Sequence, residues 1–158
     1  MLRDISLHIL DLAQNSITAG ASCIEIDLRC DIESKFFTMR IKDNGCGMTA
    51  EFLASVEDPF TTSRKTRKVG MGIPFFKLAC EQAGGEFSIK SVINEGTELS
   101  GSLEIDNIDR LPLGDVGDTT SFLISSAPMT RFLIKLASVN GEFEFDTDSV
   151  KEEIGDVP

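Results

Sequence analysis

The spacing of apolar residues predicts a helix near the start of the chain. Apolar residues recur at helical intervals over Ile5 to Ala19. Gly20 follows them, and glycine commonly ends a helix in the left-handed conformation. The polar residues His8, Asp11 and Asn15 fall on one face, opposite the apolar stripe. We therefore expect an amphipathic helix that presents these three side chains together.

Two strands are predicted next. Apolar and polar residues alternate over Ile24 to Leu28 and over Phe37 to Ile41, which is typical of half-buried strands. The polar stretch between them, residues 31–35, predicts a hairpin. The second strand runs into the turn Asp43-Asn44-Gly45-Cys46-Gly47-Met48, after which Thr49 can cap a short helix that ends near Val56.

A second long helix is expected after a polar loop over residues 58–69. It opens at Gly70-Met71-Gly72 and takes Pro74 in its first turn, where proline is tolerated. It ends at Gly84-Gly85. Two further strands follow, at Glu86 to Val92 and at Thr97 to Ile105.

The sequence pattern changes after Ile105. Strands are predicted at Thr119 to Ser126 and at Arg131 to Val139, and Asn140-Gly141 predicts a tight hairpin into Glu142 to Asp146. The pattern Ser149-x-x-Glu152 is that of a capping box for a last short helix. The fold class expected is α/β, a two-layer α/β sandwich with a mixed sheet and a C-terminal β-hairpin extension. We assign residues 1–105 to one domain and expect residues 106–158 to pack on it.

Composition narrows the class of protein. The chain has 158 residues, of which 41% are hydrophobic and 26% charged, as expected for one globular domain. A formal net charge of -11 argues against nucleic acid and anionic membranes as partners. No apolar run reaches the roughly 20 residues of a membrane helix, and residues 1–4 lack the apolar core of a signal peptide. We expect a cytoplasmic protein.

The metal and redox chemistry of the chain is also bounded by its composition. Its four cysteines form no C-x-x-C pair, and it has one histidine, so a Cys/His metal site is not expected. We expect the cysteines to be reduced thiols.

Four features in order point to a nucleotide site. They are a helix that carries an acid and an asparagine, a strand-end Asp43 followed by two glycines, a basic loop, and a G-x-G that opens a helix. Each is weak alone, because glycine motifs are common in turns. Their order resembles the GHKL ATPases, the family shared by gyrase, the Hsp90 chaperones, histidine kinases and the MutL mismatch-repair proteins. The resemblance covers about Leu2 to Ile105 and implies the ATP-binding domain of the histidine-kinase type.

The resemblance implies a purine site around Asp43. This carboxylate would accept the exocyclic amine of adenine, since a carboxylate is an acceptor only. Thr97 would support Asp43 through its hydroxyl or a bridging water. Gly45 and Gly47 would let the backbone pass close to the purine and ribose.

The resemblance also implies a phosphate site. Asn15 would ligate Mg²⁺ through its amide oxygen. Gly70 and Gly72 would present backbone N–H groups to the phosphates at a helix N-terminus. Further residues of the same motifs would contact the nucleotide, namely Met48, Phe60, Thr61, Lys65, Lys68, Met71 and Ile73.

The loop between Thr61 and Val69 concentrates positive charge in an acidic protein. It contains Arg64, Lys65, Arg67 and Lys68 and no acid. Two interpretations remain open: a solvated loop, or a lid whose cations meet the β- and γ-phosphates.

The resemblance also makes Asp11 the candidate catalytic base, because it lies four residues before Asn15, at the position where hydrolytic members of the family carry a glutamate. A hydroxyl or a water acceptor gains from a nearby base, whereas neutral imidazole does not need one. Asp11 therefore favours a serine hydroxyl or water as the phosphate acceptor. His8 is either a phosphate neighbour or an ordinary helix residue, and Cys46 either a reactive thiol beside the nucleotide or a small turn residue.

Two functions are compatible with these residues. The first is an ATP- and magnesium-dependent protein kinase or regulator that acts on a separate partner protein, with a homodimer possible. The second is an ATPase or ATP-gated binding module that phosphorylates nothing. Only seven residues precede His8, so no phosphoacceptor hairpin of the histidine-kinase kind is expected ahead of the domain. The residues after Ile105 are too few for a second clamp domain of usual size. A plain structural domain is the third alternative.

Overall fold

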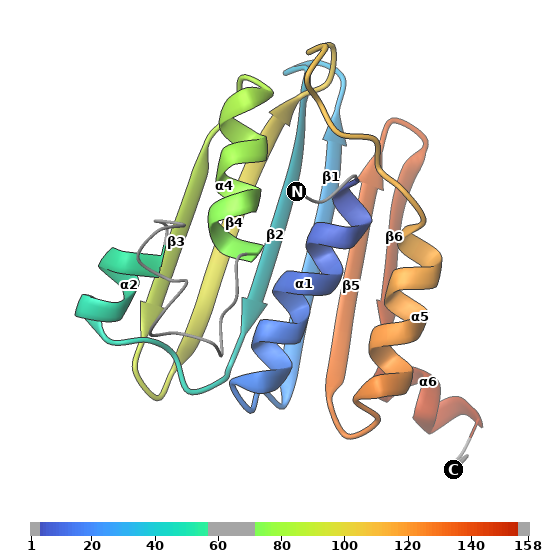
Figure 1. The fold of residues 1–158 in the computed structure, drawn as a ribbon. Helices are drawn as coiled ribbons and strands as arrows, with labels where there is room; N and C mark the ends of the chain where they lie inside the picture. Colours follow the sequence, from blue (N-terminus) through green and yellow to red (C-terminus); the bar gives the residue numbers. More distant parts are fainter. Residues whose placement is uncertain (1–3, 57–71, 155–158) are drawn as a thin grey trace.

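A six-stranded sheet forms the frame of the protein (Figure 1). The computed structural model describes residues 4–56 and 72–154, the last four of these without their side chains. The strands lie in the order β3-β4-β2-β1-β5-β6. β1 and β5 run parallel and all other neighbours are antiparallel, so the sheet is mixed as predicted. The strands are β1 (Cys23–Asp31), β2 (Phe36–Asp43), β3 (Phe87–Val92), β4 (Gly96–Glu104), β5 (Arg131–Ser138) and β6 (Gly141–Asp146).

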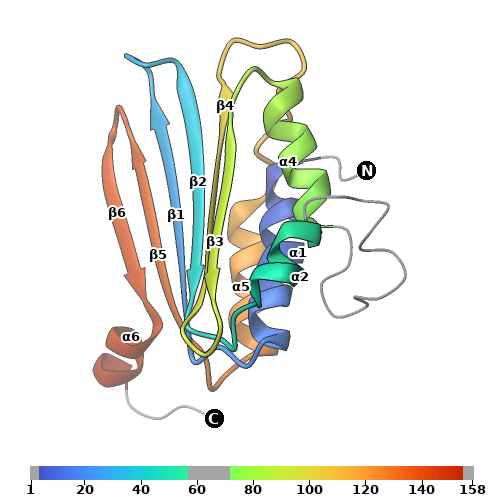
Figure 2. The same cartoon turned by 90° about the vertical axis from the view of Figure 1, so that its left-hand side faces the viewer.

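Helices cover one face of this sheet and leave most of the other face open (Figure 2). The structure therefore has the two-layer α/β architecture expected from the order of the elements. β5 and β6 follow residue 105 in the chain and extend the same sheet beyond β1. The described helices are α1 (Ile5–Thr18), α2 (Ala50–Val56), α4 (Gly72–Gln82), α5 (Val116–Ser126) and α6 (Thr147–Ile154).

The apolar stripe of α1 packs on the centre of the sheet. Ile9 and Leu12 are fully buried, as are Ile24 and Ile26 of β1 and Met39 of β2. The strand residues alternate between this core and the open face, as the sequence pattern predicts. Burial of this apolar surface fixes where α1 lies, and therefore where its polar residues lie.

The ends of α1 follow the expected rules. Asp4 caps the first turn, since its carboxylate accepts a hydrogen bond from the backbone N–H of Leu7 at 2.9 Å. The helix ends at Thr18, and Gly20 has a φ of 77°. Thr49 caps α2, because its hydroxyl accepts from the N–H of Phe52 at 3.2 Å.

The predicted strand at Thr119 to Ser126 is wrong, because this segment belongs to α5. Its β-branched residues favoured a strand, but the buried residues Thr119 and Leu123 are four apart, as on one face of a helix. Asp115 caps the helix by accepting from the N–H of Asp118 at 2.8 Å. Tertiary burial and this cap outweigh the local preference for a strand.

The last helix begins earlier than its predicted capping box. α6 starts at Thr147, so Ser149 lies inside it. The carboxylate of Asp146 accepts a hydrogen bond from the N–H of Asp148 at 3.0 Å and caps the first turn instead. Thr147 is held in place separately, since its hydroxyl accepts from the N–H of Phe132 at 3.0 Å.

His8 does not share an open polar face with Asp11 and Asn15. Its side chain is buried, and its ring lies 5.5 Å from the ring of Phe76, centroid to centroid. α4 packs beside α1 and covers this side of the helix. Neither ring nitrogen has a hydrogen-bond partner among the described residues. The structure therefore favours the ordinary helix residue over the phosphate neighbour.

Two further features concern the cysteines and the length of the helices. None of the four cysteines is paired with another in the structure. None of the helices in the described ranges is long and apolar enough to cross a membrane.

Two neighbouring residues of α5 test which face of this helix is buried. Leu123 is fully buried, whereas Phe122 is 58% exposed. We expect Leu123→Ala to lower the free energy of unfolding by about 2–5 kcal/mol, because it leaves a cavity in the core. Phe122→Ala should change it by about 0.5 kcal/mol or less. Urea unfolding of both variants measures the difference, and equal losses would contradict the packing described here.

Burial of His8 predicts a dependence of stability on pH. Desolvation lowers the pKa of His8 from 6.5 to about 4. As pH falls from 6.5 towards 4, His8 is therefore protonated in the unfolded chain but stays neutral in the folded chain. The free energy of unfolding falls by about 3 kcal/mol over that range. Unfolding measured at pH 7 and pH 4.5 should show a smaller acid loss in His8→Leu than in the unchanged protein. An identical loss in both would contradict the buried, unpartnered ring.

Candidate functional site

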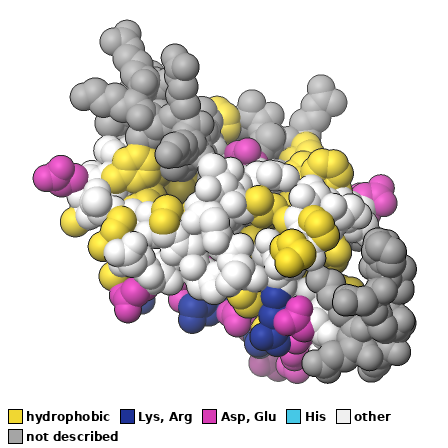
Figure 3. Space-filling view, turned by 90° about the horizontal axis from the view of Figure 1, so that it is seen from below, with side chains coloured by type: hydrophobic (Ala, Val, Ile, Leu, Met, Phe, Trp, Pro, Cys, Tyr) yellow, Lys and Arg dark blue, Asp and Glu magenta, His cyan; other side chains and the backbone are white. Residues whose placement is uncertain are grey.

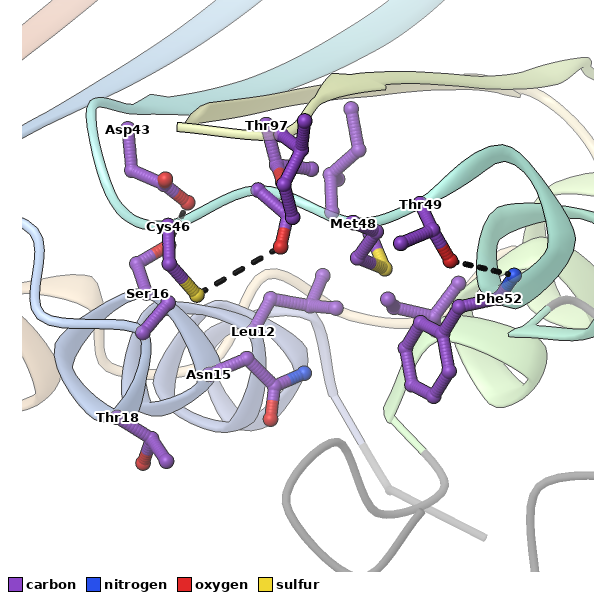
Figure 4. A pocket seen from close by; sticks show the side chains of 15 residues that line it. Leu12, Asn15, Ser16, Thr18, Asp43, Cys46, Met48, Thr49, Phe52 and Thr97 are labelled. Carbon is purple, nitrogen blue, oxygen red and sulfur yellow. Dashed lines mark hydrogen bonds between the residues drawn. The ribbon is translucent and has the colours of Figure 1, made fainter. Parts of the chain in front are cut away.

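A pocket of about 380 Å³ opens at the end of the sheet where α1 and β2 both finish. Figure 4 shows Asp43 and Thr97 on its sheet side, facing Leu12, Asn15 and Ser16 of α1. The pocket is lined by Leu12, Asn15, Ser16, Thr18, Ala19, Asp43, Cys46, Gly47, Met48, Thr49, Phe52, Ile73, Ile93, Thr97 and Leu99. Apolar side chains make up its walls, and a few polar groups from α1 and β2 converge in it. This is the usual composition of a small-molecule site.

The carboxylate of Asp43 is fixed by two hydrogen bonds. The backbone N–H of Gly45 donates to Oδ1 at 2.9 Å, and the hydroxyl of Ser16 donates to Oδ2 at 2.6 Å. Asp43 is only 9% exposed, and both contacts are buried. Each oxygen keeps further acceptor capacity, so the group can still accept a hydrogen bond from a ligand in the pocket.

The loop after Asp43 is held on both sides. The N–H of Cys46 donates to the carbonyl of Ala19 at the end of α1, at 2.9 Å. On the other side, the carbonyl of Cys46 accepts from the N–H of Asn94 at 2.7 Å. Gly47 has a φ of 68°, and a Cβ there would collide with the carbonyl of Val92. The loop can follow this path only with glycine at position 47.

Thr97 lies beside Asp43 in the β2–β4 register, but its hydroxyl contacts Ser91 at 2.7 Å. Ser91 also accepts from the N–H of Met48 at 2.8 Å, so this pair braces the loop. The side-chain donor to Asp43 is Ser16, which the sequence analysis did not name. Gly96 allows the close approach of the strands, since its φ is 127° and a Cβ would collide with the carbonyl of Asp43.

Asn15 lines the pocket one position before Ser16. Its amide nitrogen is buried and has no hydrogen-bond partner within the described residues. A buried N–H donor without a partner is costly, so a ligand that offers it an acceptor, such as a phosphate oxygen, would stabilise it. The amide oxygen is a hard, neutral donor of the kind Mg²⁺ accepts. No group of three or more His, Cys, Asp or Glu side chains that could hold a metal occurs in the part of the chain that the structure describes.

Asp11 lies one turn before Asn15 and outside the lining of the pocket. It is half-buried, and desolvation raises the pKa of its carboxyl above the ordinary value. The carboxylate sits against Gly72, the first residue of α4, where a Cβ would collide with it. The two helices therefore bring a candidate base and a candidate phosphate-binding helix end together.

The structure brings some of the predicted site residues together and leaves others untested. Six line the pocket: Asn15, Asp43, Gly47, Met48, Ile73 and Thr97. Three others adjoin it: Gly45 through its bond to Asp43, and Asp11 and Gly72 through their mutual contact. Those outside the described residues are Phe60, Thr61, Lys65, Lys68, Gly70 and Met71, together with Arg64 and Arg67 of the basic loop.

Most of the apolar wall of the pocket was not among the predicted site residues. Leu12 and Phe52 line the pocket, and neither was a predicted site residue. Leu12 lies on the helical turn between Asp11 and Asn15, and this position could have indicated that it lines the pocket. In Figure 3, which views this end of the molecule, the surface of the described residues consists mostly of apolar side chains, uncharged side chains and backbone, and the charged side chains lie mainly along its rim.

A family model described as "Histidine kinase-, DNA gyrase B-, and HSP90-like ATPase" matches residues 3–107. A sensor protein of Shewanella frigidimarina is 27% identical over 99 residues, which are 62% of this chain and 15% of that protein. Sporulation kinase D of Bacillus subtilis is 28% identical over 97 residues, which are 61% of this chain and 19% of that kinase. The chain thus spans less than a fifth of the length of these relatives.

Solved structures share the fold. The Aquifex aeolicus MutL ATPase domain complexed with ADP matches with a TM-score of 0.60 and 15% identity, over 98% of this chain and 68% of that one. The match extends through β5 and β6, which the family model does not reach. The family model covers well over half of the chain and includes every residue of the pocket. The chain therefore belongs to the histidine kinase-, DNA gyrase B- and HSP90-like ATPase family.

Proposed function

We propose that the protein binds ATP with Mg²⁺ in this pocket and acts as a protein kinase or ATP-dependent regulator on a separate partner protein. The observation that carries the proposal is the buried carboxylate of Asp43, oriented by Ser16 and Gly45 towards a largely apolar pocket. An acceptor in this place favours adenine, which offers an exocyclic amine, over a purine that offers a carbonyl.

The triphosphate would extend from the purine towards Asn15 and the first turn of α4. Gly72 stands at the N-terminus of α4, where backbone N–H groups favour an anion. Asn15 would hold Mg²⁺ through its amide oxygen, and the bound ion would offset phosphate charge. The family supports ATP as the ligand. The roles of Gly70, Lys65 and Lys68 at the phosphates remain part of the proposal.

Asp11 would act as the base for a hydroxyl or water acceptor. Its half-buried carboxyl has a raised pKa, which brings a carboxylate closer to the basicity that proton transfer needs at neutral pH. Its place against Gly72 puts it near the end of α4 that would receive the phosphates. A partner serine or threonine hydroxyl fits this arrangement, and two kinase or sensor relatives support a signalling role.

The second candidate is an ATPase or ATP-gated binding module. The structural match to the MutL ATPase domain favours it, because that match includes the C-terminal strands, whereas the kinase and sensor relatives align with about three-fifths of the chain. In this case Asp11 would activate water, and the bound nucleotide would change the affinity for a partner without phosphorylating it.

Adenine recognition is tested by two substitutions. Asp43→Ala should weaken ATP binding by about 100-fold, because it removes the charged acceptor. Ser16→Ala should weaken it by about fivefold to tenfold, since the carboxylate loses one of its two fixed donors. Calorimetric titration with MgATP measures both affinities.

Glu33→Ala is the matched control, because Glu33 is an exposed acid in the β1–β2 turn at the far end of the sheet. It should bind MgATP as the unchanged protein does. Thermal unfolding of each variant separates loss of binding from loss of fold. Unchanged affinity in a folded Asp43→Ala variant would refute the assignment.

The phosphate acceptor is tested with ATP labelled on the γ-phosphate and a cell extract. A labelled partner protein supports the kinase, and release of labelled phosphate alone supports the second candidate. In either case Asp11→Asn should slow turnover by about 100-fold or more with little loss of ATP binding, since it removes the base.

The pH profile gives an independent readout for Asp11. Activity should fall in acid as the carboxylate is protonated, with a midpoint above the ordinary aspartate pKa of 3.8 because burial raises it. An unchanged rate in Asp11→Asn would remove this residue as the base.

A further inference from the structure

β6 is an edge strand with no neighbour on its outer side among the described strands (Figure 1). It pairs only with β5, over Leu133↔Asp146 to Ser138↔Gly141. Its outer backbone groups are therefore open to another strand, which is the usual route by which an extended peptide joins a sheet. The first four residues of β6 are exposed.

The side chains of β6 alternate between acids and phenylalanines. Glu142, Glu144 and Asp146 fall on one face of the sheet, and Phe143 and Phe145 on the other. An incoming strand would therefore meet negative charge on one face and aromatic surface on the other. It fits best if it alternates in the same way, with basic residues opposite the acids and apolar residues opposite the phenylalanines.

The acids of β6 differ in whether a basic residue of the same protein already lies opposite their negative charge. Asp146 accepts hydrogen bonds from Arg131 at 2.6 and 3.0 Å. Glu144 stands opposite Lys135 in the register, whereas Glu142 stands opposite Ala137. Glu142 is exposed and forms no ion pair with another described residue. A cation from a partner strand would meet its unmatched charge here.

An apolar groove lies beside the same part of β6. It has a volume of about 450 Å³ and includes Phe37, Leu113, Val116, Leu136 and Phe143 in its lining. Phe143 is 57% exposed. The groove, which Glu142 also lines, thus gives an apolar side chain next to Phe143 a place to be buried.

A second copy of this chain is a poor occupant of the edge. Antiparallel pairing of β6 with itself about Phe143 puts Glu142 opposite Glu144, and pairing about Glu144 puts Glu142 opposite Asp146. Like charges directly opposite each other destabilise a sheet. A shift by one residue would place acids against phenylalanines instead. The net charge of -11 adds to the repulsion between copies.

We infer that β6 is a docking edge for a partner protein, which adds an extended segment of alternating basic and apolar residues to the sheet. Its cation meets Glu142, and its apolar side chain packs on Phe143 and into the groove. The edge does not depend on the nucleotide pocket, so the inference stands or fails independently of the proposed ATP chemistry.

Short labelled peptides test the docking edge by fluorescence anisotropy. The probes are a blocked hexapeptide of alternating Lys and Val, its isomer with three Lys followed by three Val, and an alternating Glu and Val peptide. The unchanged protein should bind the alternating Lys–Val peptide at least tenfold more tightly than the other two. Equal binding of the two Lys–Val isomers would show charge attraction alone and would overturn the inference.

A charge reversal gives the sharper readout. Glu142→Lys should lose at least tenfold in affinity for the alternating Lys–Val peptide and gain affinity for the Glu–Val peptide. Glu86→Lys, an exposed acid beside the opposite edge strand, is the matched control and should keep the original preference. The midpoint of thermal unfolding should be the same in both variants, which shows that each is folded.

Two results would contradict the inference. Absence of peptide binding by the unchanged protein would mean that the acids only protect the edge from pairing. A dimer seen by sedimentation that dissociates in Phe143→Lys would mean that a second copy occupies the edge.

Discussion

The hydrogen bond between Ser16 and Asp43 is the contact on which the site depends. It joins the last turn of α1 to the end of β2 at 2.6 Å, in a place that is nearly closed to water. A short bond to a charged acceptor in such surroundings is among the stronger polar contacts in a protein. It fixes the direction of the carboxylate, while burial of the apolar stripe of α1 sets the distance between helix and sheet, and together they define the pocket.

The rest of the fold keeps those two elements in register. β1 and β4 flank β2 and hold the end of the strand, while the apolar stripe of α1 is buried against the same strands. The loop after Asp43 bonds to Ala19 on one side and to Asn94 on the other, so the wall of the pocket is tied to both layers. α4 then places Gly72 against Asp11. Helices and strands therefore position Asp11, Asn15, Asp43 and Gly72, the candidate groups on α1, β2 and α4.

The periodic parts of the chain could be predicted from sequence, and the parts decided by tertiary contacts could not. The strands on either side of the first hairpin, the helix that carries Asn15 and the cap at Thr49 follow local rules. α5 does not, because burial of Leu123 outweighed the strand preference of Thr119, Thr120 and Ile124. His8 has the spacing of a polar face, and only the neighbouring α4 makes it a core residue. Ser16 gave no signal, since its role depends on a strand 27 positions away.

The central claim is that a fixed carboxylate recognises the amine of adenine. It is tested most directly by comparing MgATP with the triphosphate of purine riboside, which lacks that amine and is otherwise alike. We predict that calorimetric titration of the unchanged protein shows the purine riboside triphosphate binding at least about tenfold more weakly, as expected for the loss of one hydrogen bond to a charged acceptor. Equal affinities for the two nucleotides would contradict the account.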